Sequence, residues 1–514
     1  MTNISLITNI LHYEVYVLFI AIFFIFLINL NEIKRYFGSV SNRTWKILLA
    51  IFIFSLIVKM VPMHSHLMYQ DEASYGIIAK NMLLHSKPGQ SYYSEPENIN
   101  YYWTKNYIGW SFMIEIAYFL FGVNDFTALY LTSFIGALTT FLIFFFTYLL
   151  FKKEELSLLT AFFMSILPLH HIWSGASDTS VFAFFMLLST LTMFIIYIKT
   201  NSLKIHLLAV LILSYTIQTK NEYIFLIPII WFSYLLFMPR FRLFNFDLIK
   251  PWIILIAIIP FYIPQFLQSY SGLFKTYSYF SGINFGSWLL NYTENQPVIF
   301  LVFLIIGLFV CLKNNRKSTV FLISLYVTFM VFYTLWDGQN KYKFFMINYL
   351  CIILFQSKGI LLLRDYISRK SKRNWARMFI LLIIATSLFS SYFIGKPYWK
   401  FLNENEYILS TRIPGWIQED VGEECYITTT YNDAMILTSG TFLKVILTHD
   451  LRYINKNKLK EIDCLMYYEG MACNGIIPNT NECTFVHNKF NLSLYKKYTY
   501  GASIYRLYNV SIKE

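Results

Sequence analysis

Charged side chains are scarce in this sequence of 514 residues. Only 14% of the residues are Asp, Glu, Lys or Arg, and 56% are hydrophobic, whereas an average soluble domain has about 25% charged residues. This shortage of charge excludes an ordinary soluble protein. It indicates a chain that crosses a membrane many times.

Several common functional motifs are also missing. The sequence has no Walker phosphate-binding loop, no G-x-G-x-x-G and no G-x-S-x-G, so nucleotide-driven transport and α/β-hydrolase chemistry have no support. The net charge is +13. In a membrane protein this excess of Lys and Arg belongs in cytoplasmic loops, so we predict no nucleic-acid partner.

What the chain has instead is a series of long apolar segments. A membrane-crossing helix needs about 20 mostly apolar residues, and about 12 to 13 segments approach that length. They lie near 13–30, 45–62, 126–151, 156–173, 179–198, 205–219, 222–238, 251–267, 297–312, 318–335, 343–362 and 378–394. The segment 108–121, IGWSFMIEIAYFLF, is shorter and carries Glu115, which is typical of a re-entrant or interfacial segment.

The positions of Lys and Arg predict the orientation. Basic loops of membrane proteins lie mostly in the cytoplasm. If 108–121 does not cross, all the basic loops fall on one side, at 31–46, 152–155, 199–204, 240–242, 313–317 and 364–377. We therefore predict a multi-pass plasma-membrane protein whose first large loop, 63–125, lies outside together with the C-terminal tail.

The composition changes after residue 394. Residues 1–394 are expected to form an all-α polytopic membrane domain. In residues 395–514, short alternating segments are separated by Gly, Pro and Asn, which predicts a small external α/β domain.

Four of the six cysteines lie in this tail, at Cys425, Cys464, Cys473 and Cys483. In an exported domain this number indicates two disulfides, and three pairings are open. A zinc site is the rival interpretation, but the spacing lacks a C-x₂₋₄-C pair.

Paired carboxylates stand in the first external loop. The stretch DEASYGIIAKNMLLH begins with Asp71 and Glu72. Asp71 suits a helix N-cap, and Tyr75, Ile78 and Met82 recur with helical spacing. The pattern predicts an amphipathic helix along the membrane surface with its N-terminus at the carboxylates. An ordinary capped surface helix has the same pattern, so these residues alone do not establish a function.

The neighbouring residues resemble a known superfamily. A span followed by D-E-x-x-Y-x-x-x-A, a Lys-aromatic stretch and FLFG-x-N-D-F is similar to the GT-C integral-membrane glycosyltransferases, especially protein O-mannosyltransferases and lipid A aminoarabinose transferases. The similarity is best over about residues 60–200, and TKNEYIFLIP (219–228) and NKYKFFMINYL (340–350) are weaker matches. The resemblance implies transfer of a sugar from a polyprenyl phosphate to an acceptor protein, lipid or glycan.

The resemblance also implies roles for individual residues. Asp71 matches the catalytic carboxylate and Glu72 its acidic neighbour. Lys105, in YYWTKNYIGW, falls where related enzymes have a Lys-Pro-Pro that meets the lipid phosphate, although both prolines are replaced here. Asp178 matches a second acidic residue, and capping of the following helix is an equally good interpretation.

Carboxylate and lysine side chains suit the implied reaction. A carboxylate can take the proton of the acceptor hydroxyl, and attack opposite the phosphate would invert the anomeric carbon. Fixed cations can stabilise the charge on the leaving phosphate. Lys341 and Lys343, in WDGQNKYKFF, are further candidates for this role, unless they only snorkel to lipid headgroups.

The sequence offers no clear metal site. His64, His66, His170 and His171 occur without an H-x-x-x-H spacing, so a divalent metal is a secondary hypothesis and no cofactor is assigned.

Two other functions are open. A transporter or flippase of lipid-linked or amphipathic substrates would place charges in the membrane on broken helices, often in inverted repeats. Glu115 is the main such charge, and no repeat is evident. A structural membrane protein with a sensing tail would leave the acidic loop unexplained.

Overall fold

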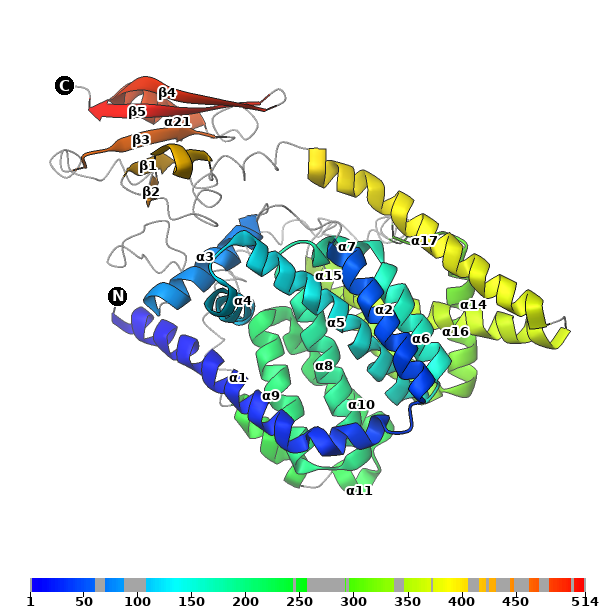
Figure 1. Cartoon of the computed structure of the whole chain (residues 1–514). Coiled ribbons are helices and arrows are strands. Elements are labelled where there is room, and N and C mark those ends of the chain that lie inside the picture. The colour runs from blue at the N-terminus through cyan, green and yellow to red at the C-terminus, as the bar shows by residue number, and fades with distance from the viewer. Residues whose placement is uncertain are drawn as a thin grey trace.

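The computed structural model describes the chain in several stretches: residues 2–60, 70–86, 108–243, 246–256, 292, 295–336, 346–370, 373–404, 416–421, 425–430, 444–447, 462–470, 480–500 and 503–512. They form a large helical part up to residue 404 and a small C-terminal sheet from residue 416 on (Figure 1). The fold class predicted from the sequence is confirmed.

The helical part begins with two apolar helices, α1 (Thr2–Phe37) and α2 (Asn42–Met60). α3 (Gln70–His85) and α4 (Ile108–Phe121) come from the predicted first external loop. The other helices are α5 (Asp125–Phe151), α6 (Glu154–Ile166), α7 (Pro168–Ser174), α8 (Thr179–Thr200), α9 (Leu203–Thr219), the 3₁₀ helix η2 (Asn221–Phe225), α10 (Leu226–Phe237), α11 (Arg240–Leu243), α14 (Phe300–Asn314), α15 (Arg316–Trp336), α16 (Met346–Lys370) and α17 (Arg373–Glu404).

Every predicted span overlaps a helix, although 251–267 is described only up to residue 256. Within the described stretches, five helices are long and apolar enough to cross a membrane, or six if α6 and α7 form one span that bends by 58°. Leu167 lies at that bend with extended backbone, because a residue before proline is disfavoured in the helical conformation. Helices such as α4, α9 and α14 are apolar but shorter.

A close helix crossing joins α14 to α16. A Cβ atom at Gly307 would lie 1.8 Å from the carbonyl oxygen of Phe355, and one at Gly359 would lie 2.0 Å from that of Phe303. Both obstacles are backbone atoms, so they cannot rotate away. Glycine at both positions therefore lets the two backbones touch, as in many membrane helix pairs.

The C-terminal sheet has the strand order β2-β1-β3-β5-β4. Its strands are β1 (Tyr426–Thr429), β2 (Lys444–Leu447), β3 (Leu465–Glu469), β4 (Phe490–Tyr500) and β5 (Ser503–Ile512), and α21 (Thr480–Lys489) precedes β4. β1 pairs in parallel with β2 and β3, whereas β5 pairs antiparallel with β3 and β4. The tail is thus a mixed α/β unit.

Alternating side chains build a core on each face of the sheet. Met466 and Tyr468 pack on one face with Ile417 of the short helical segment 416–421. Tyr467 packs on the other face with Val486 of α21. This period of two is the alternation expected of a strand that is covered on both sides.

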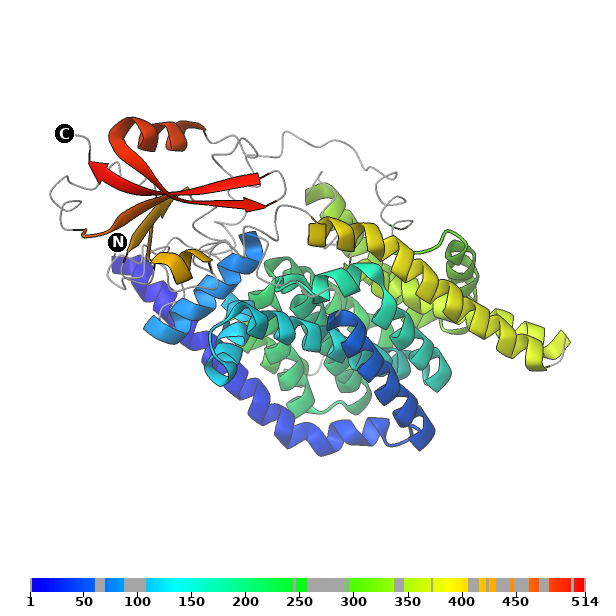
Figure 2. The same cartoon turned by 45° about the horizontal axis from the view of Figure 1, so that its top comes forward.

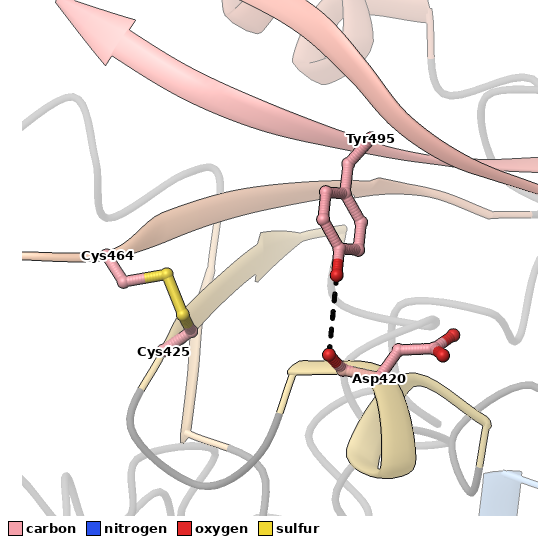
Figure 3. Close-up of a disulfide and its surroundings, with 4 residues drawn as sticks. All are labelled: Asp420, Cys425, Cys464 and Tyr495. Carbon is pink, nitrogen blue, oxygen red and sulfur yellow. Dashed lines mark hydrogen bonds between the residues drawn. A yellow bond between two sulfur atoms is a disulfide. The ribbon is translucent and has the colours of Figure 1, made fainter.

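A disulfide joins Cys425 to Cys464 (Figure 3). The two cysteines directly precede β1 and β3, and parallel pairing brings these strand starts together. Cys483 in α21 is also disulfide-bonded, and Cys473 lies outside the described residues. Figure 3 further shows Tyr495 of β4 donating a hydrogen bond to the carbonyl oxygen of Asp420 at 3.4 Å.

The C-terminal sheet lies on the same side of the helical part as α3 and the first turns of α1, above them in Figure 1 and next to them in Figure 2. The acidic stretch in α3 and the tail therefore share one side of the helical part. The basic loops predict that this shared side is the outer one, and that orientation stays a prediction.

Candidate active site

α3 carries the acidic pair at its beginning. The helix starts at Gln70, so Asp71 and Glu72 lie in its first turn rather than before it. The N-cap position predicted for Asp71 is therefore wrong by two residues, since Asp71 is the second residue of the helix. An acidic side chain in the first turn is still favoured by the helix dipole. Glu72 is fully buried.

α3 is enclosed by the protein and is not the one-sided surface helix that its spacing predicted, because Ser74 and Asn81 are buried as well as the apolar positions. Tyr75, Ile78 and Met82 are buried, and α3 packs along α4. Since α3 holds the acidic pair, its packing fixes the position of the acidic turn relative to the start of α4.

The start of α4 contacts the loop before α8 and the end of α9. The indole Nε1 of Trp110 donates to the carbonyl oxygen of Ser177 at 3.1 Å. A Cβ atom at Gly109 would meet Thr219 Oγ1 at 2.9 Å and the Thr219 nitrogen at 3.1 Å. Lys105, three residues before α4, lies outside the described residues. The chain that follows Lys105 is nevertheless anchored to the loop before α8 and to the end of α9.

Asp178 caps α8. Its carboxylate accepts from the Ser180 amide at 2.7 Å, and the residue is buried. The hydroxyl of Thr179 donates to the carbonyl oxygen of Thr219 at 3.2 Å. Asp178 therefore has the capping role that the sequence suggested as one interpretation. The next residue, Thr179, contacts the end of α9 directly.

A buried ion pair follows the end of α9. Lys220 and Glu222 have side chains that are 4% and 1% exposed, and Lys220 Nζ lies 3.6 Å from Glu222 Oε1. The ammonium also lies 5.7 Å from the ring centre of Tyr333, near the end of α15. These residues were not assigned a role from the sequence. The signal was present in TKNEYIFLIP, where Lys and Glu flank a link between two apolar segments.

Glu115 is held by α1. Tyr16 of α1 donates a hydrogen bond to Glu115 Oε1, and Glu14 accepts from the amide of Gln218 in α9 at 3.1 Å. Both contacts join the beginning of α1 to helices of the candidate site. Glu115 therefore has a structural partner at the side of the site.

Two of the four candidate histidines, His170 and His171, lie in the described part of the chain. His170 and His171 are buried in α7, near Lys59, whose ammonium donates to the Ser165 carbonyl oxygen at 3.4 Å. No group of three or more His, Cys, Asp or Glu that could hold a metal occurs within the described part of the chain. His64 and His66 lie outside that part, as do Lys341 and Lys343.

No protein-family model matches the sequence. No characterised protein matches it in a sequence search either.

Solved structures do match its fold. ArnT from Cupriavidus metallidurans bound to undecaprenyl phosphate superimposes with a TM-score of 0.61 at 13% identity, over 91% of this chain and 98% of that one. The apo state of ArnT gives 0.59 at 13% identity and the same coverage. The Archaeoglobus fulgidus oligosaccharyltransferase tethered to an acceptor peptide gives 0.56 at 10% identity, over 92% of this chain and 74% of that one. These proteins are GT-C glycosyltransferases. The chain has the GT-C fold.

Several helix ends converge at one place in this fold. The starts of α4 and α8 and the end of α9 are in direct contact, and α3 with its acidic turn packs on α4. Carboxylates and a buried lysine thus lie at the ends of helices on one side of the helical part. Such a set of groups can accept a proton and compensate a bound anion.

Proposed function

We propose that this protein is a membrane glycosyltransferase. It transfers a sugar from a polyprenyl phosphate to an acceptor protein, lipid or glycan. The observation that carries the proposal is that acidic and basic residues lie at converging helix ends within a GT-C fold. One structure with a similar fold, that of ArnT, was solved with bound undecaprenyl phosphate. Another similar structure, the Archaeoglobus fulgidus oligosaccharyltransferase, is tethered to an acceptor peptide, which supports an acceptor as the second substrate.

The proposed reaction is an inverting displacement. The acceptor oxygen forms a bond to the anomeric carbon and transfers its proton to Asp71. The bond from that carbon to the phosphate oxygen breaks, and the electron pair leaves with the polyprenyl phosphate. Glu72 orients Asp71, and Asp178 is the second acidic residue of the site.

Cations are needed where the phosphate charge develops. Lys105, Lys341 and Lys343 are proposed for this role from the sequence. Lys105 has the best support among them, because the start of α4, to which it leads, is fixed against α8 and α9. A divalent metal is not required by this scheme.

The reaction is proposed to take place outside the cell. The proposed membrane domain is 1–394 and the external domain 395–514, with the loop 63–125 also outside. The placement of the C-terminal sheet next to α3 supports a shared side for the two (Figure 2), and the Cys425–Cys464 disulfide supports an oxidising, external compartment for that side.

Replacement of Asp71 tests the function. Asp71→Asn keeps the size of the side chain but cannot accept a proton, so sugar transfer should fall about 10²- to 10⁴-fold. Purified protein in nanodiscs would be assayed for release of polyprenyl phosphate from radiolabelled polyprenyl-phosphate sugars. Glu72→Gln should be milder, and Lys105→Ala should weaken donor binding more than turnover. Near-normal transfer by a well-folded Asp71→Asn variant would remove Asp71 from the mechanism.

One observation favours a transporter as the second candidate. The broken pair α6–α7 lies next to the buried Lys59, and broken helices with buried charges are common in transporters. A transporter of lipid-linked substrates would move the labelled lipid across a vesicle membrane without cleaving it.

A further inference from the structure

The link between α9 and η2 is a buried polar segment of the candidate site. α9 ends because Lys220 takes an extended backbone conformation, and its amide still bonds to the Thr216 carbonyl oxygen at 3.0 Å. The next residues, Asn221 and Glu222, open the 3₁₀ helix η2. Three consecutive polar residues are thereby buried within an apolar helical part.

Burying this lysine is costly without a compensating anion, because the ammonium loses its hydration. Glu222 provides that anion, but Lys220 Nζ and Glu222 Oε1 are 3.6 Å apart, beyond direct hydrogen-bond distance. The rings of Tyr223 and Tyr333, with centres 6.0 Å and 5.7 Å from Nζ, contribute only weak attraction. Glu222 is thus a charge partner of Lys220 at a distance longer than a hydrogen bond.

Asn221 adds an independent observation. Its side chain is 1% exposed, and neither its amide nitrogen nor its amide oxygen has a hydrogen-bond partner within the described part of the protein. A buried amide without partners costs about 1–3 kcal/mol per unsatisfied group. Such a group next to a buried cation indicates that a polar ligand completes the site.

The position of this link decides which ligand fits. Thr219, directly before Lys220, contacts Gly109 of α4 and Thr179 of α8. The link therefore adjoins the two helix starts that follow Lys105 and Asp178. It lies where the reacting end of the donor must sit if the proposed function is correct.

We propose that Lys220 is a cation of the donor-phosphate site and that Glu222 is its counter-ion when no donor is bound. This proposal rests on the proposed function. The lipid-linked phosphate binds to Lys220 and takes the place of Glu222 as its compensating charge, and the Asn221 amide donates a hydrogen bond to a phosphate oxygen. No covalent bond changes in this step.

Direct binding of undecaprenyl phosphate tests the proposal. The full chain in nanodiscs would be titrated with undecaprenyl phosphate, with undecaprenol to measure binding of the tail alone and inorganic phosphate to measure binding of the anion alone. Lys220→Met should weaken undecaprenyl phosphate binding about 10- to 100-fold, the factor typical of a lost hydrogen bond to a charged group. Its affinity for undecaprenol should not change.

Glu222→Gln separates a binding role from a structural one. If Glu222 competes with the phosphate for Lys220, removing its charge should tighten undecaprenyl phosphate binding. If the pair only stabilises the fold, both variants should lose affinity together and unfold at lower temperature. Lys59→Met is the matched control, because Lys59 is also a fully buried lysine but bonds to a backbone carbonyl. Its binding should equal that of the unmodified protein.

The outcomes distinguish this inference from the function on which it rests. Unchanged binding by a folded Lys220→Met variant, or an equal loss in Lys59→Met, overturns the role of Lys220 and leaves the glycosyltransferase proposal standing. A loss of affinity in Glu222→Gln overturns the counter-ion exchange. If the unmodified protein binds undecaprenyl phosphate no better than undecaprenol, the proposed donor class and this inference both fail.

Discussion

Cysteine is used differently in the helical part and in the C-terminal sheet. Cys311 and Cys351 are buried free thiols in α14 and α16. Cys425 and Cys464 are joined, and Cys483 is disulfide-bonded as well. Disulfides persist in oxidising compartments, and a small sheet has little apolar core of its own. The sheet is thus built like an exported domain.

The helical part and the C-terminal sheet also differ in the partners that their polar side chains bind. Many buried hydroxyls of the helical part bond to carbonyls of their own helix, as Thr132 does to Ala128 at 2.9 Å and Thr160 to Leu156 at 2.8 Å. In the sheet, Glu469 instead pairs with a partly exposed arginine, Arg506, at 2.8 Å. Lipid offers no water to satisfy polar groups. Helix carbonyls therefore satisfy hydroxyls in the apolar helical part, whereas the sheet uses an ion pair that water can reach.

The largest expected effect concerns the sides of the membrane. Ser493→Cys on β4 should react fully with an impermeant maleimide on intact cells, because the sheet is proposed to lie outside. Lys370→Cys at the end of α16 should react only after lysis. Both positions are exposed, so access to the reagent depends on the side alone. Labelling of Lys370→Cys with protection of Ser493→Cys would reverse the orientation.

Loss of the disulfide should come next in size. Cys425→Ser with Cys464→Ser removes the bond that joins the starts of β1 and β3, and a disulfide contributes about 2–5 kcal/mol in small domains. Hydrogen exchange of β1 and β3 in the full chain should accelerate accordingly, whereas exchange in α8 should not change. Cys311→Ala is the control, because it removes a buried thiol without removing a cross-link. Unaltered protection in β1 would show that the bond is dispensable.

Substitution of a glycine where α14 crosses α16 should have the next largest effect. Gly307→Ala places a Cβ atom 1.8 Å from the Phe355 carbonyl oxygen, so α14 must move away from α16. Overpacking of this kind costs about 1–3 kcal/mol and should lower the thermal midpoint of the purified protein in detergent. At Gly38 the added Cβ meets only ordinary contacts, the nearest at 3.6 Å, so Gly38→Ala should leave the midpoint unchanged. Equal midpoints for both variants would contradict the crossing.

Local patterns predicted much of this fold. The helical spacing of Tyr75, Ile78 and Met82 predicted the helix α3, and the short apolar run 108–121 is α4 with the same bounds. The change of composition after residue 394 predicted an α/β tail, although α17 runs ten residues past that boundary, to Glu404. Each of these features depends on neighbours within a few turns, so sequence periodicity is sufficient to find them.

Long-range pairings could not be predicted in the same way. The bond of Cys425 to Cys464 depends on parallel pairing of β1 and β3, and three connectivities were equally open. Lys220 became a candidate only when Thr219 was found against α4 and α8. Which helix ends meet is decided by packing over more than 100 residues of sequence. The roles of Asp71, Lys105, Lys341 and Lys343 stay predictions.

The smallest expected effect concerns a charge cluster on the sheet. Both oxygens of Asp420 accept from Lys496 Nζ at 2.6 Å, and one also accepts from Tyr498 at 2.7 Å. Lys496 is about half exposed, so this ion pair is partly screened by water. Exposed ion pairs contribute about 0.2–1 kcal/mol, and Asp420→Asn should lower the stability of β4 by that amount at pH 7.

The pH dependence of this effect has a fixed sign. Partial burial acts to raise the pKa of Asp420, but the hydrogen bonds from Lys496 and Tyr498 outweigh it and hold the pKa below its ordinary value of 3.8. A carboxyl group whose pKa is lowered by folding stabilises the fold above its unfolded pKa and loses that contribution as the pH falls through its folded pKa. Hydrogen exchange of residues 490–500, corrected for intrinsic rates, should therefore separate Asp420→Asn from the unmodified protein at pH 7. The two should converge as the pH drops below 3.8, because the protonated carboxyl then pairs no better than the amide. A difference that persists or grows in acid would mean that shape at Asp420, and not its charge, secures β4 to the helical segment 416–421.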